Sequence, residues 1–228
     1  MILRTLVAPV LGATCSVLAD DAGRCVVVDP GGGVAAKVLA LVAAEGWIPV
    51  AVLATHGHVD HTWAAAELCA AYDVPLHLHA DDAYRLDDPF GTLGALGPQL
   101  AAMAGLAAPP RPSRVQTFTA QPDGTVRLHL GTPSTGHLDL AGLHVPGHTE
   151  GSTVYLADAP GRTALTGDVL FAGTIGRTDL PGGDPRAMTL SLARLARLAA
   201  DTVVVPGHGP TSTIAAELAS NPYLRAAR

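Results

Sequence analysis

A chain of 228 residues is long enough to bury a sizeable core, and we expect residues 1–228 to form one domain. Hydrophobic residues make up 48% of the chain and charged residues 15%, a balance that excludes intrinsic disorder. Fourteen Lys and Arg residues against twenty Asp and Glu residues give a net charge of -6, which argues against a nucleic-acid partner, and no apolar run reaches the ~18 residues of a membrane span.

The amino-terminal segment imitates a short signal peptide, because Arg4 is followed by an apolar run over 6–11. Two strands over 14–19 and 25–28 flank a polar turn directly after it and predict a β-hairpin. Cleavage of a leader would remove a strand, so we expect the protein to stay in the cytoplasm. The three cysteines, Cys15, Cys25 and Cys69, are then expected to be free thiols, with Cys15 and Cys25 the one pair that could face each other across this hairpin.

Strands and helices alternate in the first half of the chain, which predicts an α/β architecture. Helices are expected over 34–45 and 60–71, and strands over 50–54 and 76–79. In the second half the predicted elements are strands over 125–130, 138–145, 152–156, 163–165 and 202–205, and helices over 184–199 and 213–219.

A dense cluster of ligand-type residues directly follows the predicted strand 50–54. It has the pattern H-x-H-x-D-H and contains His56, His58, Asp60 and His61. Histidines two residues apart in an extended segment project to the same side, so His56 and His58 can bind one metal ion. Asp60 and His61 lie where the next helix begins and point elsewhere, and a carboxylate beside an imidazole suits a second divalent ion.

Three more ligand-type residues follow predicted strands in the second half of the chain. His148 offers a third imidazole to the first ion, Asp168 a carboxylate that can bridge both ions, and His208 an imidazole to the second ion. A glycine beside each of the three allows a tight turn. The remaining histidines are expected to be structural or solvent-facing, with His79 as the first exception to consider: His77, His79, His129, His137 and His144.

At these positions the chain resembles the metallo-β-lactamase superfamily. His56, His58, Asp60 and His61 match its first metal motif, and His148, Asp168 and His208 match the next three; its early strand-end motif matches 28–32. The resemblance covers nearly the whole chain. It implies an αββα sandwich with a dinuclear metal site at one edge, between the two sheets.

Finer features resemble the short bacterial hydroxyacylglutathione hydrolase group, also called glyoxalase II-like. They lie in the segment 167–184 and in the tail 211–224, which contains Asn221-Pro222-Tyr223. Longer enzymes of this type carry a further helical domain that holds the glutathione and has no counterpart in these 228 residues. The thiol of the substrate therefore stays open, as does the oligomeric state.

The resemblance implies a metal-dependent hydrolase with two divalent ions, zinc first and iron or manganese as alternatives. A metal-bound hydroxide would attack the carbonyl of a small-molecule thioester such as S-lactoylglutathione, with Asp60 and Asp168 as catalytic residues. Asp168 would bridge the ions, and Asp60 would orient the nucleophile. The alternative is a persulfide dioxygenase that uses a single iron held by His56, His148 and Asp168, because 176–179 also resembles that branch.

Other residues are expected to support the ligands or the substrate. Asp29, Thr149 and Ser152 are candidates for hydrogen bonds that orient the ligands, with turn formation as the alternative role. Arg177 is a candidate for binding an anionic substrate group, with an exposed, solvated side chain as the alternative.

The segment 81–112 connects the two halves in a looser pattern of short helical pieces. Five of its apolar residues recur at three- and four-residue spacing: Leu93, Leu96, Leu100, Met103 and Leu106. Two interpretations stay open. The segment is either a cover over the metal edge that offers apolar surface to the substrate, or a stripe packed on the core.

Overall fold

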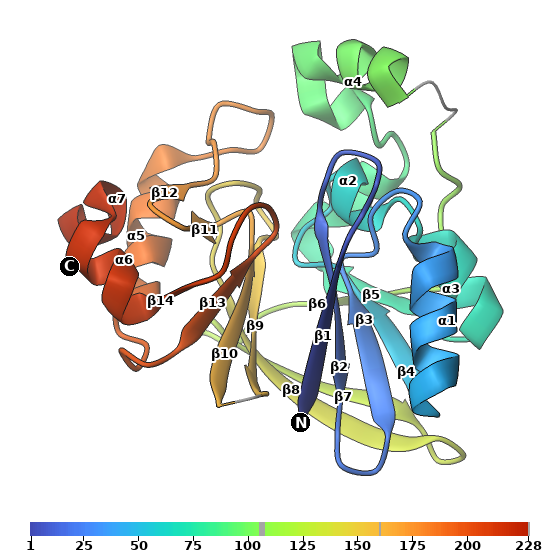
Figure 1. The fold of residues 1–228 in the computed structure, drawn as a ribbon. Helices are drawn as coiled ribbons and strands as arrows, with labels where there is room; N and C mark the ends of the chain where they lie inside the picture. Colours follow the sequence, from blue (N-terminus) through green and yellow to red (C-terminus); the bar gives the residue numbers. More distant parts are fainter. Residues whose placement is uncertain (105–107, 160, 228) are drawn as a thin grey trace.

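The computed structural model describes residues 1–104, 108–159 and 161–227. Two six-stranded sheets lie face to face, and helices cover the outer side of each sheet (Figure 1). The predicted α/β fold, an αββα sandwich, is therefore confirmed. Among the described residues, none of the helices combines the length and the apolar character needed to cross a membrane.

The first sheet has the order β1-β2-β3-β4-β5-β6, and its strands are parallel from β3 onward. Its strands are β1 (Ile2–Val7), β2 (Thr14–Ala19), β3 (Arg24–Val28), β4 (Ile48–Leu53), β5 (Leu76–His79) and β6 (Val115–Phe118). The helices α1 (Ala35–Glu45) and α3 (Ala65–Tyr72) lie on its outer face. The carboxyl ends of parallel strands meet at one edge, so the loops after β4 and β5 lie side by side.

The second sheet has the order β14-β13-β10-β9-β8-β7. Its strands are β7 (Thr125–Thr132), β8 (Gly136–His144), β9 (Thr153–Asp158), β10 (Arg162–Gly167), β13 (Val203–Pro206) and β14 (Ser212–Thr213). Its outer face is covered by α5 (Pro185–Leu195), α6 (Ile214–Ser220) and α7 (Pro222–Ala226). A small hairpin, β11 (Leu170–Phe171) and β12 (Thr174–Ile175), follows β10.

Apolar side chains alternate between the two faces of the central strands. Val27 and Val52 point toward the helices of the first sheet, whereas Val26 and Leu53 point toward the second sheet. Strands buried on both faces need such continuous apolar runs, which explains the sequences of β3 and β4. The layer between the sheets is completed by side chains of the second sheet, among them the fully buried Tyr155.

The segment between β5 and β6 is partly packed in the core and partly stands above the strand ends, and its contact with a substrate stays a prediction. Its elements are η1 (Ala80–Leu86), η2 (Gly91–Leu96) and α4 (Gly97–Ala104). Leu93 is buried, whereas Leu96 and Leu100 are half-buried, and α4 stands above the strand ends at the top of Figure 1. Leu106 and the side chain of Met103 lie outside the described residues.

Several predictions about local structure need correction. The helix expected over 60–71 is two helices, α2 (Val59–Thr62) and α3. The strand β1, which pairs with β2 at the edge of the first sheet, is not among the predicted strands. The prediction that Cys15 and Cys25 could face each other is wrong, because Cys25 pairs with Ala19 in the hairpin register and Cys15 with Leu6. All three cysteines are buried and free.

Candidate metal centre

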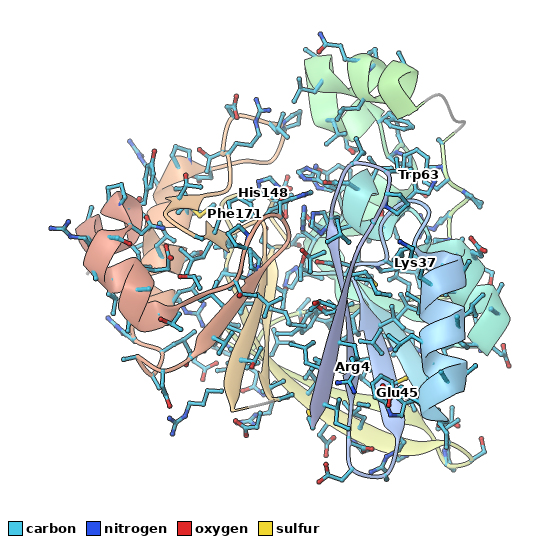
Figure 2. All side chains as sticks on the ribbon, in the orientation of Figure 1. Arg4, Lys37, Glu45, Trp63, His148 and Phe171 are labelled. Carbon is cyan, nitrogen blue, oxygen red and sulfur yellow. The ribbon has the colours of Figure 1, made fainter. Side chains whose placement is uncertain are left out.

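Three imidazoles converge after the ends of β4 and β8. We call His56, His58 and His148 the tri-histidine set. The Nδ1 atom of His58 lies 3.1 Å from Nε2 of His56 and 2.9 Å from Nε2 of His148, and all three side chains are buried. Figure 2 shows His148 between the two halves of the molecule. Three ring nitrogens aimed at one point are the arrangement that a metal ion stabilises.

Hydrogen bonds on the far side of the rings select the nitrogens that face inward. The Nδ1 atom of His148 donates to the backbone carbonyl of Arg177 over 2.8 Å, and Nδ1 of His56 lies 3.1 Å from Oγ1 of Thr55. A proton on Nδ1 leaves the Nε2 lone pair free to bind a metal. Both rings thus present Nε2 to the centre, whereas His58 presents Nδ1.

A second group lies beside the first and mixes carboxylates with imidazoles. We call Asp60, His61, Asp168 and His208 the mixed set. The Nε2 atom of His208 lies 3.1 Å from Oδ2 of Asp60, and Nε2 of His61 lies 3.3 Å from Oδ1 of Asp168. The other oxygen of Asp168, Oδ2, lies 3.7 Å from Nε2 of both His148 and His208. Asp168 therefore stands between the two sets, where a shared ligand would have to be.

The chemistry of these donors fits a pair of divalent ions. Among the described residues, Nε2 of His61 and Oδ1 of Asp168 are buried without a hydrogen-bond partner. Leaving such polar atoms unpaired is costly unless another species binds them. A Cβ atom at Gly207 would come within 2.2 Å of Oδ1 of Asp168 and 2.6 Å of Cε1 of His61, so the backbone there approaches as closely as only glycine allows.

The two sets differ in their protonation. Burial lowers the pKa of His56, and it lowers the pKa of His58 to about 3, so both rings are neutral at pH 7. Burial also disfavours a charge on His61, but Asp60 and Asp168 together raise its pKa well above the ordinary value. The hydrogen bond to Asp60 raises the pKa of His208 as well.

This difference predicts that metal uptake by the two sets releases different numbers of protons. A metal ion displaces the proton that His61 holds in the metal-free protein, whereas His56 and His58 have no proton to lose. The zinc affinity of the mixed set should therefore fall as pH falls, by about tenfold per pH unit for each proton displaced. Calorimetric titration in buffers of different ionisation enthalpy measures the protons released at each step; equal release at both steps would contradict the assignment.

Asp29 supports the mixed set through buried hydrogen bonds. It accepts from the backbone N–H and the hydroxyl of Thr55, both at 2.7 Å, and its Oδ2 lies 3.0 Å from Nδ1 of His61. Its φ of 53° is unusual for a residue other than glycine, although aspartate tolerates this region better than most. The carboxylate therefore holds the His61 ring with Nε2 directed at the centre.

Thr149 and Ser152 act on the loop that carries His148. The Thr149 N–H donates to Oγ of Ser152 over 3.1 Å, and its hydroxyl donates to Oδ2 of Asp82 over 2.8 Å. The sequence does not identify Asp82, because a lone carboxylate in an irregular segment carries no spacing signal. Its contacts with this loop show a buried network next to the tri-histidine set.

Arg177 is not a free cation at the rim of the site. Its guanidinium pairs with both oxygens of Asp179 at 2.7 Å, and this pairing lowers the pKa of Asp179 to about 2. The expected binding of a substrate anion would first have to break that pair. What Arg177 does contribute to the site is the backbone carbonyl that accepts from His148.

A third group of ligand-type residues, His79, Asp81 and His144, lies near the first two. The rings of His79 and His144 are stacked at 4.0 Å with an angle of 6° between their planes. Parallel rings direct their lone pairs in parallel and cannot both point at one ion. We therefore assign no metal to this group, in agreement with a structural role for His79 and His144.

Comparison with known proteins places the chain in a family. The model of the metallo-β-lactamase superfamily matches residues 8–208, and the chain belongs to that superfamily. The hydroxyacylglutathione hydrolase GloC of Haemophilus influenzae is 32% identical over 211 residues, which cover 92% of each chain. Two solved structures are similar. The B3 metallo-β-lactamase BLEG-1 has a TM-score of 0.80 and is 29% identical, and the match covers 98% of this chain and 99% of that one. TTHA1623 in a di-iron-bound form has a TM-score of 0.78 and is 35% identical, and the match covers 96% of this chain and 99% of that one.

Proposed function

We propose that this protein is a metal-dependent hydrolase that cleaves a small-molecule thioester, such as S-lactoylglutathione or a related acyl-thiol. The observation that carries the proposal is the completeness of both ligand sets, with Asp168 between them. The name of the GloC relative supports the thioester as substrate class. We further propose zinc as the resident metal, with iron or manganese as alternatives, and a cytoplasmic location without a nucleic-acid or membrane partner.

The chain's own residues would hold the reacting groups in place. His56, His58 and His148 would bind one ion, and Asp60, His61 and His208 the other, with Asp168 shared. Two such ions supply Lewis acidity and lower the pKa of a bound water to roughly 7, so that hydroxide is available at neutral pH. The free oxygen of Asp60 would accept a hydrogen bond from the nucleophile and fix its direction.

The completeness of the mixed set also favours hydrolysis over persulfide oxidation. A single iron would need only His56, His148 and Asp168. The chain nevertheless keeps Asp60, His61 and His208 within 4.8 Å of one another and of Asp168, and Asp29 orients His61. The di-iron form of TTHA1623 supports a site for two ions whatever the metal.

The function is tested by turnover without oxygen, together with metal analysis of the purified protein. Hydrolysis of S-lactoylglutathione or another acyl-thiol under nitrogen, with two ions per chain, is the expected result. Oxygen uptake with a persulfide and one iron per chain would overturn it in favour of the dioxygenase. A chromogenic cephalosporin belongs in the panel because BLEG-1 is a β-lactamase; turnover of that compound alone would overturn the thioester as substrate.

Substitutions in the segment above the site should separate packing from substrate contact. Leu93→Ala removes a buried side chain and should lower the free energy of unfolding by roughly 2–5 kcal/mol while leaving KM nearly unchanged. Leu100→Ala, at a half-buried position on α4, should raise KM or alter acyl preference with little loss of stability. Urea unfolding and steady-state kinetics on both variants measure the difference. If Leu100→Ala only destabilises, α4 is not part of the substrate pocket.

A further inference from the structure

An ion pair lies buried beside the tri-histidine set and is not among its ligands. Asp82 and Arg85 belong to η1, and both side chains have an exposed fraction of 0%. Oδ1 of Asp82 accepts from Nε of Arg85 over 3.3 Å. A buried ion pair contributes little net stability by itself, because both charges have lost their water.

The carboxylate of Asp82 joins the two loops that carry the tri-histidine set. Its Oδ2 accepts from the backbone N–H of Gly57, between His56 and His58, over 2.8 Å, and from the hydroxyl of Thr149 over 2.8 Å. Its Oδ1 accepts from the backbone N–H of Gly151 over 2.9 Å. One side chain thus fixes the position of the His148 loop relative to the loop after β4.

The backbone of both loops approaches the pair more closely than a side chain would permit. A Cβ atom at Gly57 would lie 2.7 Å from the backbone oxygen of Asp82 and 2.9 Å from Cδ of Arg85. A Cβ atom at Gly151 would lie 2.7 Å from Cγ of Asp82. Glycine at both positions therefore makes room for this carboxylate.

Arg85 holds the carboxylate from the other side. Its guanidinium donates to the backbone carbonyl of Pro181 over 3.0 Å and pairs with Glu150, which lies in the His148 loop. These contacts hold the guanidinium in place while its Nε donates to Oδ1 of Asp82, so both carboxylate oxygens stay directed at the two loops.

We propose that Asp82 is a positioning residue that sets the separation of His58 and His148 and thereby the metal affinity of the tri-histidine set. It would act through Gly57 and Thr149 without touching an ion. The mixed set has its own buried carboxylate, Asp29, which holds His61. Loss of Asp82 should therefore weaken one set and spare the other, a selectivity that a general structural role would not produce.

The test is Asp82→Asn, which keeps the shape of the side chain but replaces one carboxylate oxygen by an NH2 group. That group would face an N–H donor of one of the two loops, so one hydrogen bond would be lost. The metal-free protein is titrated with zinc in competition with a chromogenic chelator, and the variants His58→Ala and His208→Ala identify which step belongs to which set. The affinity of the tri-histidine set should fall roughly 10- to 100-fold, the usual effect of losing a group that orients a ligand. The affinity of the mixed set should change by less than about threefold, because the group that orients His61 is Asp29 and not Asp82.

A matched pair at Thr149 gives a milder test should Asp82→Asn fail to fold. Thr149→Val removes the hydroxyl at nearly constant shape and should weaken the same step, whereas Thr149→Ser keeps the hydroxyl and should restore it. The proposal would be overturned if Asp82→Asn left the ratio of the zinc affinities of the tri-histidine and mixed sets unchanged. If Asp82→Asn does not fold, the same result in Thr149→Val would overturn it. Because metal binding rather than turnover is measured, the result is independent of the proposed substrate.

Discussion

Asp168→Ala is expected to weaken both metal sites at once, which no other single ligand change should do. Asp168 is the residue whose carboxylate lies within 3.7 Å of His148 and of His208, at the junction of the tri-histidine and mixed sets. Its removal takes away a shared ligand and the negative charge that offsets the repulsion between two cations. The affinity for each ion should fall by more than about 100-fold, the upper end of the effect of losing a group that only orients a ligand.

Metal content after dialysis and competition with a chelator measure this effect. Asp139→Ala is the matched control, because Asp139 is an exposed carboxylate of the same sheet that pairs with His129. It should keep both ions and normal turnover. An Asp168→Ala protein that retains two tightly bound ions would show that this carboxylate is not shared.

Asp29→Ala should lower the stability of the protein as strongly as the loss of a buried apolar side chain. The substitution leaves the N–H of Thr55 buried without an acceptor and removes the acceptor for Nδ1 of His61. It also places alanine at a φ of 53°, which aspartate tolerates better. The free energy of unfolding of the metal-free protein should fall by about 2–5 kcal/mol, measured by urea denaturation.

Asp29→Asn separates the stability effect from the effect on metal binding. Asparagine tolerates the same backbone conformation, so less stability should be lost. Its amide offers one oxygen where the carboxylate offers two, so it cannot accept from both the backbone N–H of Thr55 and Nδ1 of His61. When Nδ1 of His61 has no acceptor, the proton no longer prefers Nδ1, and the lone pair of Nε2 is less often free to bind a metal. Zinc binding by the mixed set should be weakened most, with a smaller effect on the tri-histidine set, because Oγ1 of Thr55 links Asp29 to Nδ1 of His56. Equal weakening of both sets would contradict this expectation.

The gathering of the seven ligand candidates could be predicted because each follows the end of an apolar strand. In an α/β fold such ends meet at one edge, so the spacing in sequence translates into proximity in space. Asp29 could be recognised for the same reason, since it directly follows β3. The assignment of these residues as ligands stays a prediction until metal is measured.

Asp82 and Arg85 could not be predicted, because their importance lies in contacts across 25 to 96 residues of chain. Neither residue belongs to a motif, and η1 has no periodic pattern that would mark a buried face. Arg177 shows a different difficulty. The sequence identifies a basic residue at the expected place, but only the structure shows that Asp179 occupies its guanidinium and that its carbonyl meets His148.

Because the ligands come from both sheets, metal binding would stabilise the association of the two halves of the chain. His58 and His148 are 90 residues apart, and Asp60 and His208 are 148 residues apart. Ions bound between them would close long loops, and a cross-link across about 100 residues constrains an unfolded chain by roughly 4–5 kcal/mol. The ions would thus act as reversible cross-links between the amino-terminal and carboxyl-terminal halves. A newly made chain deprived of metal would hold its halves together by the apolar layer between the sheets and by hydrogen bonds such as those of Asp82. Without the ions, the shared edge should open more often and be cleaved more readily by proteases.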